Sequence, residues 1–257
     1  VLNYWQISQR LMLRSRVIPI ILIKDGYVVK SINFKNLKYI GEPINIVKIF
    51  NDKEADEIVV YDIGCYNSNI NFDLIKNIAA ITRMPFCYGG GLKKIDDRKK
   101  IFSYGIEKVS LNSIIFDNIN FVKEVSKLVG NQSTVITLDI NLGSNGYYIE
   151  KNNIYLNEID MINLIRKLED LGAGEIIINC IHSDGTMKGF DTKLLDKLYN
   201  LVTTPITLVG GASSYNEINS ISNKYKYLGI GVGSLFIYKG INRAVLINYP
   251  EELTKKF

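Results

Sequence analysis

An acidic residue stands at the end of one strongly apolar stretch of the chain. Residues 134–140 read TVITLDI, in which Asp139 follows a run that is typical of a buried strand. A carboxylate in such a place can act as a general acid or base. The simpler alternative is that Asp139 only caps the loop that follows the strand.

His182 is the only histidine in the sequence. A Ser-His or Cys-His couple, or a metal site with several histidines, would therefore have to use this one residue. The three cysteines, Cys65, Cys87 and Cys180, lack CxxC spacing, so we predict buried, reduced thiols rather than a zinc site or a disulfide framework. Carboxylate or lysine chemistry remains, and we predict neither a metal nor a cofactor.

Glycine clusters follow two other apolar runs and precede helical segments. Gly89–Gly91 follow PFCY, and Gly210 and Gly211 follow PITLV. Glycines there let backbone N–H groups approach an anion, and a helix start adds favourable partial charge. One such cluster is an ordinary turn signal, but the two together predict two phosphate sites. The predicted anion-binding residues are Gly90, Gly91, Asn112, Ser113, Asp184, Gly185, Thr186, Gly210, Gly211, Gly233 and Ser234.

The elements that must position these residues alternate along the chain. Eight short β-rich runs cover residues 17–23, 57–63, 85–88, 108–112, 134–140, 175–181, 205–209 and 227–233. Segments with apolar residues at helical spacing separate most of them, over residues 44–53, 72–81, 96–105, 118–130, 158–172 and 192–202. Eight strand–helix units in a chain of 257 residues predict a (β/α)8 TIM barrel. An open doubly wound sheet is the alternative.

An internal repeat supports a barrel built from two halves. Residues 85–113 and 205–234 share the order proline, apolar strand, glycine cluster, helix, strand and small polar residue, at an offset of about 120 residues. The same offset relates the first strand to the fifth, and it pairs Leu22 in PIILIKDG with Asp139. The two phosphate sites would then face each other across the barrel mouth and suit a ligand with two anionic ends.

Bulk composition bounds the remaining possibilities. With 47% apolar and 22% charged residues, the chain is ordinary globular material with no apolar run long enough to span a membrane. The net charge of +5 comes without clustered basic and aromatic residues, so we expect no nucleic-acid partner. Residues 1–13 are predicted to be an N-terminal extension and residues 14–257 a single domain. The start lacks the features of a secretory signal, so we expect a cytoplasmic protein.

Several motifs together resemble the cyclase subunit of imidazole glycerol phosphate synthase. They are VIPIILIKDGYVVKSINFKNL, EIVVYDI, YGGGLK, EKVSLNS, TLDI, LGAGEIIINCIHSDGTMKGFD, PITLVGGAS and GSLF. The resemblance extends over nearly the whole chain from Arg14 onward. It implies a (β/α)8 barrel that receives ammonia from a separate glutaminase subunit and adds it to a two-phosphate substrate in histidine biosynthesis.

The resemblance also assigns roles at the mouth. The family uses two aspartates, at the ends of strands 1 and 5, as general acid and base; Asp139 matches the second, whereas Leu22 occupies the place of the first. Leu22 cannot move a proton, so ordinary cyclase activity is in doubt. Lys30, expected in the loop after strand 1, matches an active-site lysine of the family, and His182 replaces an acid.

At the opposite end, four charged residues match the ring that gates the ammonia entrance in the family. They are Arg16, Glu57, Lys108 and Glu175, at the starts of strands 1, 2, 4 and 6. A ring of salt bridges that serves stability alone is the simpler interpretation of such residues. The resemblance instead implies that ammonia passage and a docked glutaminase are retained.

The chain has Leu22 in place of the strand 1 acid but keeps all four charged residues of the ring. In this combination it resembles a divergent subgroup associated with bacterial surface polysaccharides. That resemblance implies amidination of a nucleotide-linked sugar, carried out either on this chain or by a third, ATP-using protein that receives the ammonia. A histidine-pathway cyclase and a non-catalytic conduit that activates the glutaminase are the alternatives. If the chain were instead an unrelated phosphate-sugar isomerase, the match of these four charged residues to the family's ring would be a coincidence.

Overall fold

The computed structural model describes residues 15–66, 70–151 and 153–253. The predicted residues 1–13 lie outside this part, so the extension stays a prediction. Within the described part, no helix is long and apolar enough to cross a membrane.

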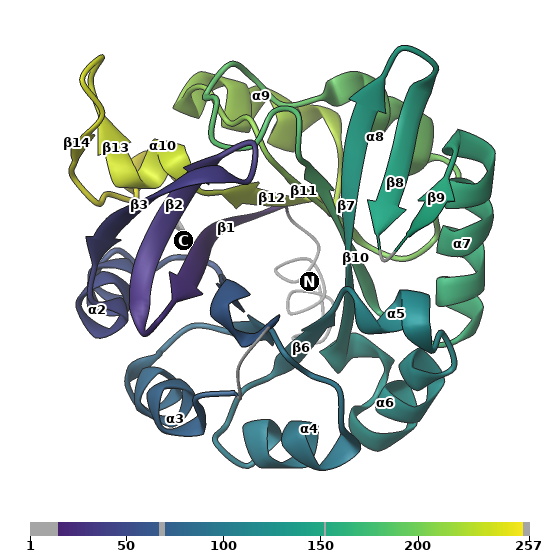
Figure 1. Ribbon diagram of the computed structural model, residues 1–257. Coiled ribbons are helices and arrows are strands. Elements are labelled where there is room, and N and C mark those ends of the chain that lie inside the picture. The colour runs from purple at the N-terminus through teal and green to yellow at the C-terminus, as the bar shows by residue number, and fades with distance from the viewer. Residues whose placement is uncertain (1–14, 67–69, 152, 254–257) are drawn as a thin grey trace, which may run out of the picture.

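Eight parallel strands close into a barrel, as Figure 1 shows in a view roughly along its axis. Their order around the barrel follows the chain, and pairing of the fifth strand with the sixth completes the ring. The strands are β1 (Arg16–Lys24), β4 (Ile58–Asp62), β5 (Phe86–Gly89), β6 (Lys108–Leu111), β7 (Thr134–Gly143), β10 (Glu175–Cys180), β11 (Ile206–Val209) and β12 (Gly229–Val232). The predicted (β/α)8 barrel is confirmed, and the open sheet is excluded.

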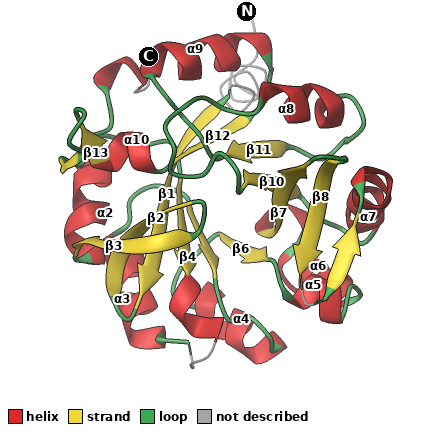
Figure 2. Ribbon diagram, turned by 45° about the horizontal axis from the view of Figure 1, so that its top comes forward, coloured by secondary structure: helices red, strands yellow, loops and turns green. Residues whose placement is uncertain are grey.

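Helices surround the strands on the outside, as the tilted view in Figure 2 also shows. They are α2 (Pro43–Asp52), α3 (Phe72–Ile81), α4 (Ile95–Phe102), α5 (Ile114–Asp117), α6 (Phe121–Val129), α7 (Glu158–Asp170), α8 (Thr192–Tyr199), α9 (Tyr215–Lys224) and α10 (Ser234–Ile237). Several begin where a side chain accepts hydrogen bonds from free helix N–H groups: Asn71 caps α3, Asn157 caps α7, Asp191 caps α8 and Ser214 caps α9.

Two apolar cores result from the alternation of side chains along the barrel strands. Residues that point outward pack against the helices in one large cluster. Inward-pointing residues form a second, smaller cluster inside the barrel, which consists of Ile18, Ile20, Val59, Cys87, Val135, Ile177 and Val209. The strands therefore read as continuous apolar runs in the sequence, because both of their faces are covered.

Three hairpins extend beyond the barrel strands and were not predicted. The first comprises β2 (Tyr27–Ile32) and β3 (Lys35–Gly41), and β2 pairs with the end of β1. In the second, β8 (Gly146–Lys151) pairs with the end of β7 and with β9 (Ile154–Leu156). The third joins β13 (Tyr238–Lys239) to β14 (Ala244–Val245). The first two bring additional side chains to the mouth.

The two predicted halves have matching local structure. In each half a strand is followed by two glycines, a helix, a second strand and a four-residue helix, α5 in one half and α10 in the other. A β-carbon on Gly90 would lie 2.5 Å from the backbone oxygen of Asp62, and one on Gly210 would lie 2.6 Å from that of Cys180. The same close approach to the preceding strand therefore requires glycine in both halves.

Candidate active site

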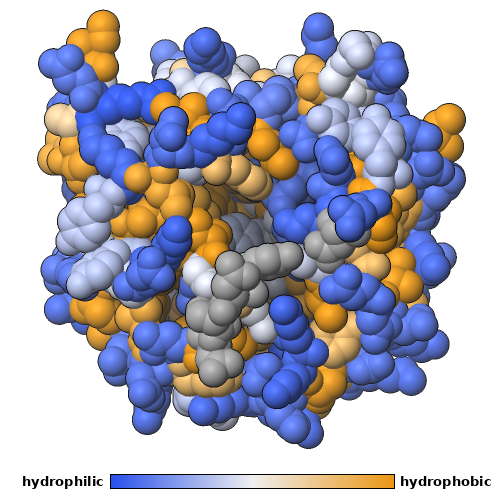
Figure 3. Space-filling model, viewed as in Figure 1, coloured by the Kyte–Doolittle hydropathy of each residue, from blue (hydrophilic) through white to orange (hydrophobic). Residues whose placement is uncertain are grey.

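A cavity of about 420 Å³ opens at the carboxyl ends of the barrel strands. Its lining includes Leu22, both predicted catalytic residues and most of the predicted anion-binding residues. Figure 3 shows this face of the molecule hollowed near its centre, with hydrophobic residues along part of the wall and hydrophilic residues around the rim. The members predicted from the sequence are Lys30, Gly90, Gly91, Asn112, Ser113, Asp139, Asp184, Gly185, Gly210, Gly211, Gly233 and Ser234.

The glycine loops adopt backbone conformations that other residues avoid. Gly90 and Gly91 have φ of 137° and 64°, and Gly210 and Gly211 have φ of 104° and 101°. These values lie in the left-handed region, where a side chain would be strained. Each loop leads into a helix and lines the cavity, so both can present backbone N–H groups to an anion.

Asp139 is held by three side chains, from the residue after β6 and from strands β10 and β8. Asn112 Nδ2 donates to Asp139 Oδ2 at 2.8 Å, and Asn179 Nδ2 donates to Asp139 Oδ1 at 2.9 Å. The ammonium of Lys151, on the β8 hairpin, lies 3.4 Å from Oδ2. These contacts fix the position of the carboxylate at the cavity mouth. Asn112, predicted as an anion ligand, therefore also orients the carboxylate.

The opposite wall of the mouth carries no such carboxylate on β1. Leu22 is half-buried, lines the cavity and is paired with Tyr61 of β4 and Val29 of β2. The acid on which the predicted two-carboxylate mechanism depends is thus replaced by an apolar side chain within the cavity wall. Asp139, at the facing wall on β7, keeps its carboxylate and is held by polar side chains.

Lys30 is buried and Asp184 is half-buried, and both line the cavity. Lys30 Nζ donates to the backbone oxygen of Ile20 at 2.8 Å, and burial lowers its pKa to about 8 against the opposing attraction of Asp184. Burial raises the pKa of Asp184, while Lys30 opposes the shift. Lys30 can therefore lose its proton near neutral pH, a property suited to general base chemistry.

The structure corrects the expected position of Lys30 and places Thr186 and His182 outside the cavity lining. Lys30 lies within strand β2 rather than in a loop, because the chain after β1 turns back at once to form a hairpin. Thr186 does not line the cavity; its hydroxyl donates to the backbone oxygen of Ser183 at 2.7 Å. His182 also lies outside the lining, with Nε2 3.0 Å from Asp191 Oδ2.

Among the polar cavity residues that the sequence analysis did not predict are Asp62, Tyr61, Asn179 and Lys151. Asp62 ends the apolar run EIVVYDI much as Asp139 ends TVITLDI, so the same signal could have found it. Asn179 and Tyr61 lie inside apolar strands, where only the inward direction of their side chains reveals their place. Lys151 reaches the mouth through an unpredicted hairpin, and no local pattern marks it.

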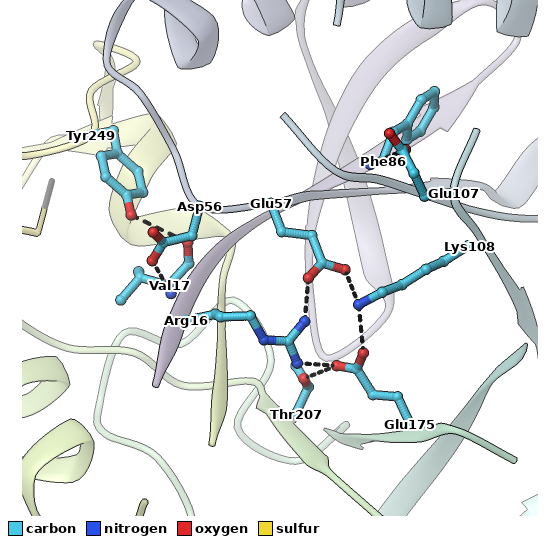
Figure 4. Close-up of polar contacts among 10 residues, drawn as sticks. All are labelled: Arg16, Val17, Asp56, Glu57, Phe86, Glu107, Lys108, Glu175, Thr207 and Tyr249. Atoms are coloured by element: carbon cyan, nitrogen blue, oxygen red, sulfur yellow. Dashed lines mark hydrogen bonds and ion pairs between the residues drawn. The ribbon is translucent and has the colours of Figure 1, made fainter. Parts of the chain in front are cut away.

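The four charged residues predicted for the opposite end form one closed ring (Figure 4). Arg16 bonds to both carboxylates, to Glu57 through Nη1 and to Glu175 through Nη2 at 2.9 Å. Lys108 Nζ lies 2.8 Å from each of the same two carboxylates. The hydroxyl of Thr207 also donates to Glu175. Cations and anions thus alternate around the barrel floor.

The two carboxylates of this ring are not equivalent. Burial alone would raise the pKa of Glu175, but Arg16 and Lys108 outweigh burial and lower it to about 2. Burial and the neighbouring charge of Glu175 raise the pKa of Glu57. Glu175 is therefore the firmly ionised member, and Glu57 takes up a proton first when the pH falls.

The chain is a closed (β/α)8 barrel with a cavity at the carboxyl ends of its strands and a charged ring at the opposite end, and comparison with known proteins identifies its family. The profile of the family described as "Histidine biosynthesis protein" matches residues 16–242. The chain belongs to this family.

Curated relatives match along almost their whole length. One from Vibrio vulnificus, named "Putative imidazole glycerol phosphate synthase subunit hisF3", is 42% identical, with 95% of this chain and 96% of the relative covered. One from Leptospira interrogans, "Putative imidazole glycerol phosphate synthase subunit HisF", is 39% identical over 95% of this chain and 98% of the relative. The "Imidazole glycerol phosphate synthase subunit HisF" of Lactococcus lactis is 35% identical over 95% of each chain.

Proposed function

We propose that this chain is the barrel subunit of a glutamine amidotransferase related to imidazole glycerol phosphate synthase. A glutaminase docks on the floor, and ammonia passes through the ring of Arg16, Glu57, Lys108 and Glu175 into the barrel. A ligand with two anionic ends binds between the glycine loops at the mouth. Asp139 and Lys30 are the groups available there to move protons.

The observation that carries this proposal is the contrast between a complete floor and an incomplete mouth. All four ring residues are paired, whereas Leu22 replaces one of the two acids that the cyclase reaction uses. Loss of a general acid or base costs about 100- to 10,000-fold in rate. The histidine-pathway reaction is therefore disfavoured, and amidination of a nucleotide-linked sugar for surface polysaccharide is the preferred role.

A nucleotide sugar carries a diphosphate, so it can use the same glycine-rich anion sites. The second candidate is a barrel without chemistry of its own, which activates the glutaminase and conducts ammonia to a third, ATP-using enzyme. The replacement of the strand 1 acid by Leu22 specifically favours this second candidate, because it leaves the mouth without its acid–base pair.

A substrate comparison tests the proposal. The purified chain is supplied with ammonium and the two-phosphate aminoaldose intermediate of histidine biosynthesis, then with UDP-sugars, each with and without the glutaminase. We expect little or no imidazole product, and robust formation of that product by the wild-type chain would refute the argument from Leu22.

Asp139→Asn should lower the rate of any product formed by about 100-fold or more. The exposed Asp170→Asn is the matched control, and an unchanged rate in Asp139→Asn supports the conduit.

A second comparison tests the floor. Lys108→Ala should reduce glutamine-driven activity more than ammonium-driven activity, because free ammonium reaches the mouth without crossing the ring. Lys127→Ala, at an exposed position on α6, controls for the loss of a lysine elsewhere. Equal losses of activity with glutamine and with ammonium would mean that Lys108 has a structural role only.

A further inference from the structure

Between the charged floor and the mouth, the barrel interior is mostly apolar. Its inner cluster includes Ile18, Val59, Cys87 and Val135. Tyr61 packs against this cluster and also lines the mouth cavity. Ile20, Ile177 and Val209 also do both, but Tyr61 has the longest of these side chains and so is the one that can separate the two compartments.

The Tyr61 ring lies across the barrel rather than along its wall. A β-carbon on Gly89, the residue paired with Tyr61 on the next strand, would lie 2.7 Å from Tyr61 Cδ1. The ring thus runs over β5, and glycine is required beneath it. Its hydroxyl reaches Thr137 Oγ1 on β7 at 2.7 Å, and Thr137 is in turn 2.7 Å from Ser110 Oγ on β6.

These three residues all line the cavity, and their hydroxyls form a polar level next to the apolar interior of the barrel. Burial raises the pKa of Tyr61 far above its ordinary value, so the phenol stays neutral at physiological pH. The hydroxyl group can exchange hydrogen bonds with a neutral molecule without creating a buried charge. One hydrogen bond, to Thr137, fixes the end of the ring, and the cavity above offers space into which the ring can turn.

We propose that Tyr61 is the movable floor of the mouth cavity, a side chain that separates the ligand from the barrel interior and swings aside for a small neutral amine. The identity of the amine as ammonia rests on the proposed function, whereas the barrier itself does not. When the ring is closed, it keeps bulk water and a bound ligand away from the charged ring. When it opens, the hydroxyls of Thr137 and Ser110 offer the passing molecule hydrogen bonds.

Cys87 provides a reporter of this barrier in the chain itself. Its thiol lies in the inner cluster below Tyr61 and is fully buried, and the charged-ring residues influence its pKa. Cys180 is equally buried but belongs to the outer core between strands and helices. Small reagents that enter from the mouth can therefore reach Cys87, but not Cys180, when the ring is open.

The experiment labels the full-length chain with methyl methanethiosulfonate and measures each cysteine by peptide mass spectrometry. In Tyr61→Leu, labelling of Cys87 relative to Cys180 should rise about tenfold or more, because it follows the fraction of time that the cover is open. Tyr61→Phe keeps the ring but removes its hydrogen bond to Thr137, so the labelling of Cys87 relative to Cys180 should rise less than in Tyr61→Leu. The near-isosteric Phe variant decides the test if the Leu variant does not fold.

Unchanged labelling of Cys87 in both variants would overturn the proposal, because reagents would then enter by another route. A parallel rise at Cys180 would also overturn it, because Tyr61 would then serve only general packing. The labelling needs neither partner nor substrate. A Tyr61 effect without a glutamine-specific effect of Lys108→Ala leaves the barrier in place and refutes the amidotransferase role.

Discussion

The two ends of the barrel differ in how their charged groups are satisfied. At the floor, two cations and two carboxylates bond to one another in a closed set, and each cation contacts both acids. At the mouth, Asp139 is held by two amides and a lysine, while Lys30 donates to a backbone carbonyl and Leu22 offers no polar group. The floor is complete without a ligand, and the mouth is not.

This difference distinguishes polar groups that stabilise the fold from polar groups that are candidates for function. In a closed ring of opposite charges, the attraction between the charges offsets their desolvation cost without any ligand, so the ring can persist in a barrel whose mouth chemistry has changed. At the mouth, Lys30 has a lowered pKa because it is buried and donates to a backbone carbonyl rather than to a carboxylate. Perturbed groups in a cavity are candidates for function.

The largest expected effect on stability comes from opening the floor ring. Glu175→Gln leaves Arg16 and Lys108 with one carboxylate between them, and we expect a loss of about 3–5 kcal/mol in the free energy of unfolding, as for other broken buried ion pairs. Urea denaturation measures it. Lys224→Met removes an exposed pair with Asp196 and should cost less than about 1 kcal/mol. Equal losses would mean that the ring is no more than a surface network.

Much of this contrast could be predicted from the sequence. The strands and helices appeared as apolar runs and helical periodicity, because the strands are covered on both faces and the helices on one. The ring residues stand at strand starts, and the glycine clusters stand at strand ends. Strand position alone decides at which end of a parallel barrel such residues lie.

Contacts between strands could not be predicted in the same way. The bonds from Asn112 and Asn179 to Asp139 depend on the register of three strands, and Lys151 depends on a hairpin that interrupts the regular alternation. Arg98 is a further example: it is fully buried in α4, where its guanidinium lies 3.8 Å from the centre of the Phe121 ring. Arginine is rarely fully buried in a folded protein, so residue type alone does not indicate this position.

A smaller effect should appear as a pH dependence from Lys30 at the mouth. Its pKa is about 8 in the folded chain, against an ordinary value of 10.5. Between these values the unfolded chain holds a proton that the native chain has lost, so stability rises with pH; below about 8 the buried ammonium destabilises the fold. Relative to Lys30→Met, the wild-type chain should gain about 3 kcal/mol between pH 8 and 10.5.

Unfolding free energies of both proteins across this pH range check the prediction, because other titrating groups cancel in the difference. Lys127→Met, at an exposed position, should run parallel to the wild type. A constant difference between wild type and Lys30→Met would mean that Lys30 keeps its proton in the native state. The mouth would then resemble the floor in holding a fixed charge.

The smallest effect tests whether the polar network beside the mouth is as strong as the floor. Tyr147, on the β8 hairpin that carries Lys151, has its hydroxyl 2.9 Å and 3.0 Å from the two carboxylate oxygens of Asp191, which also caps α8. Tyr147→Phe removes these bonds but keeps the ring, so we expect a loss of about 1–2 kcal/mol in thermal or urea unfolding. Tyr148→Phe, whose ring stacks on Tyr155 with centroids 5.2 Å apart, should change little. A loss as large as that of Glu175→Gln would show that the mouth hairpin is fixed as firmly as the floor, and the contrast between the two ends would then rest on Leu22 alone.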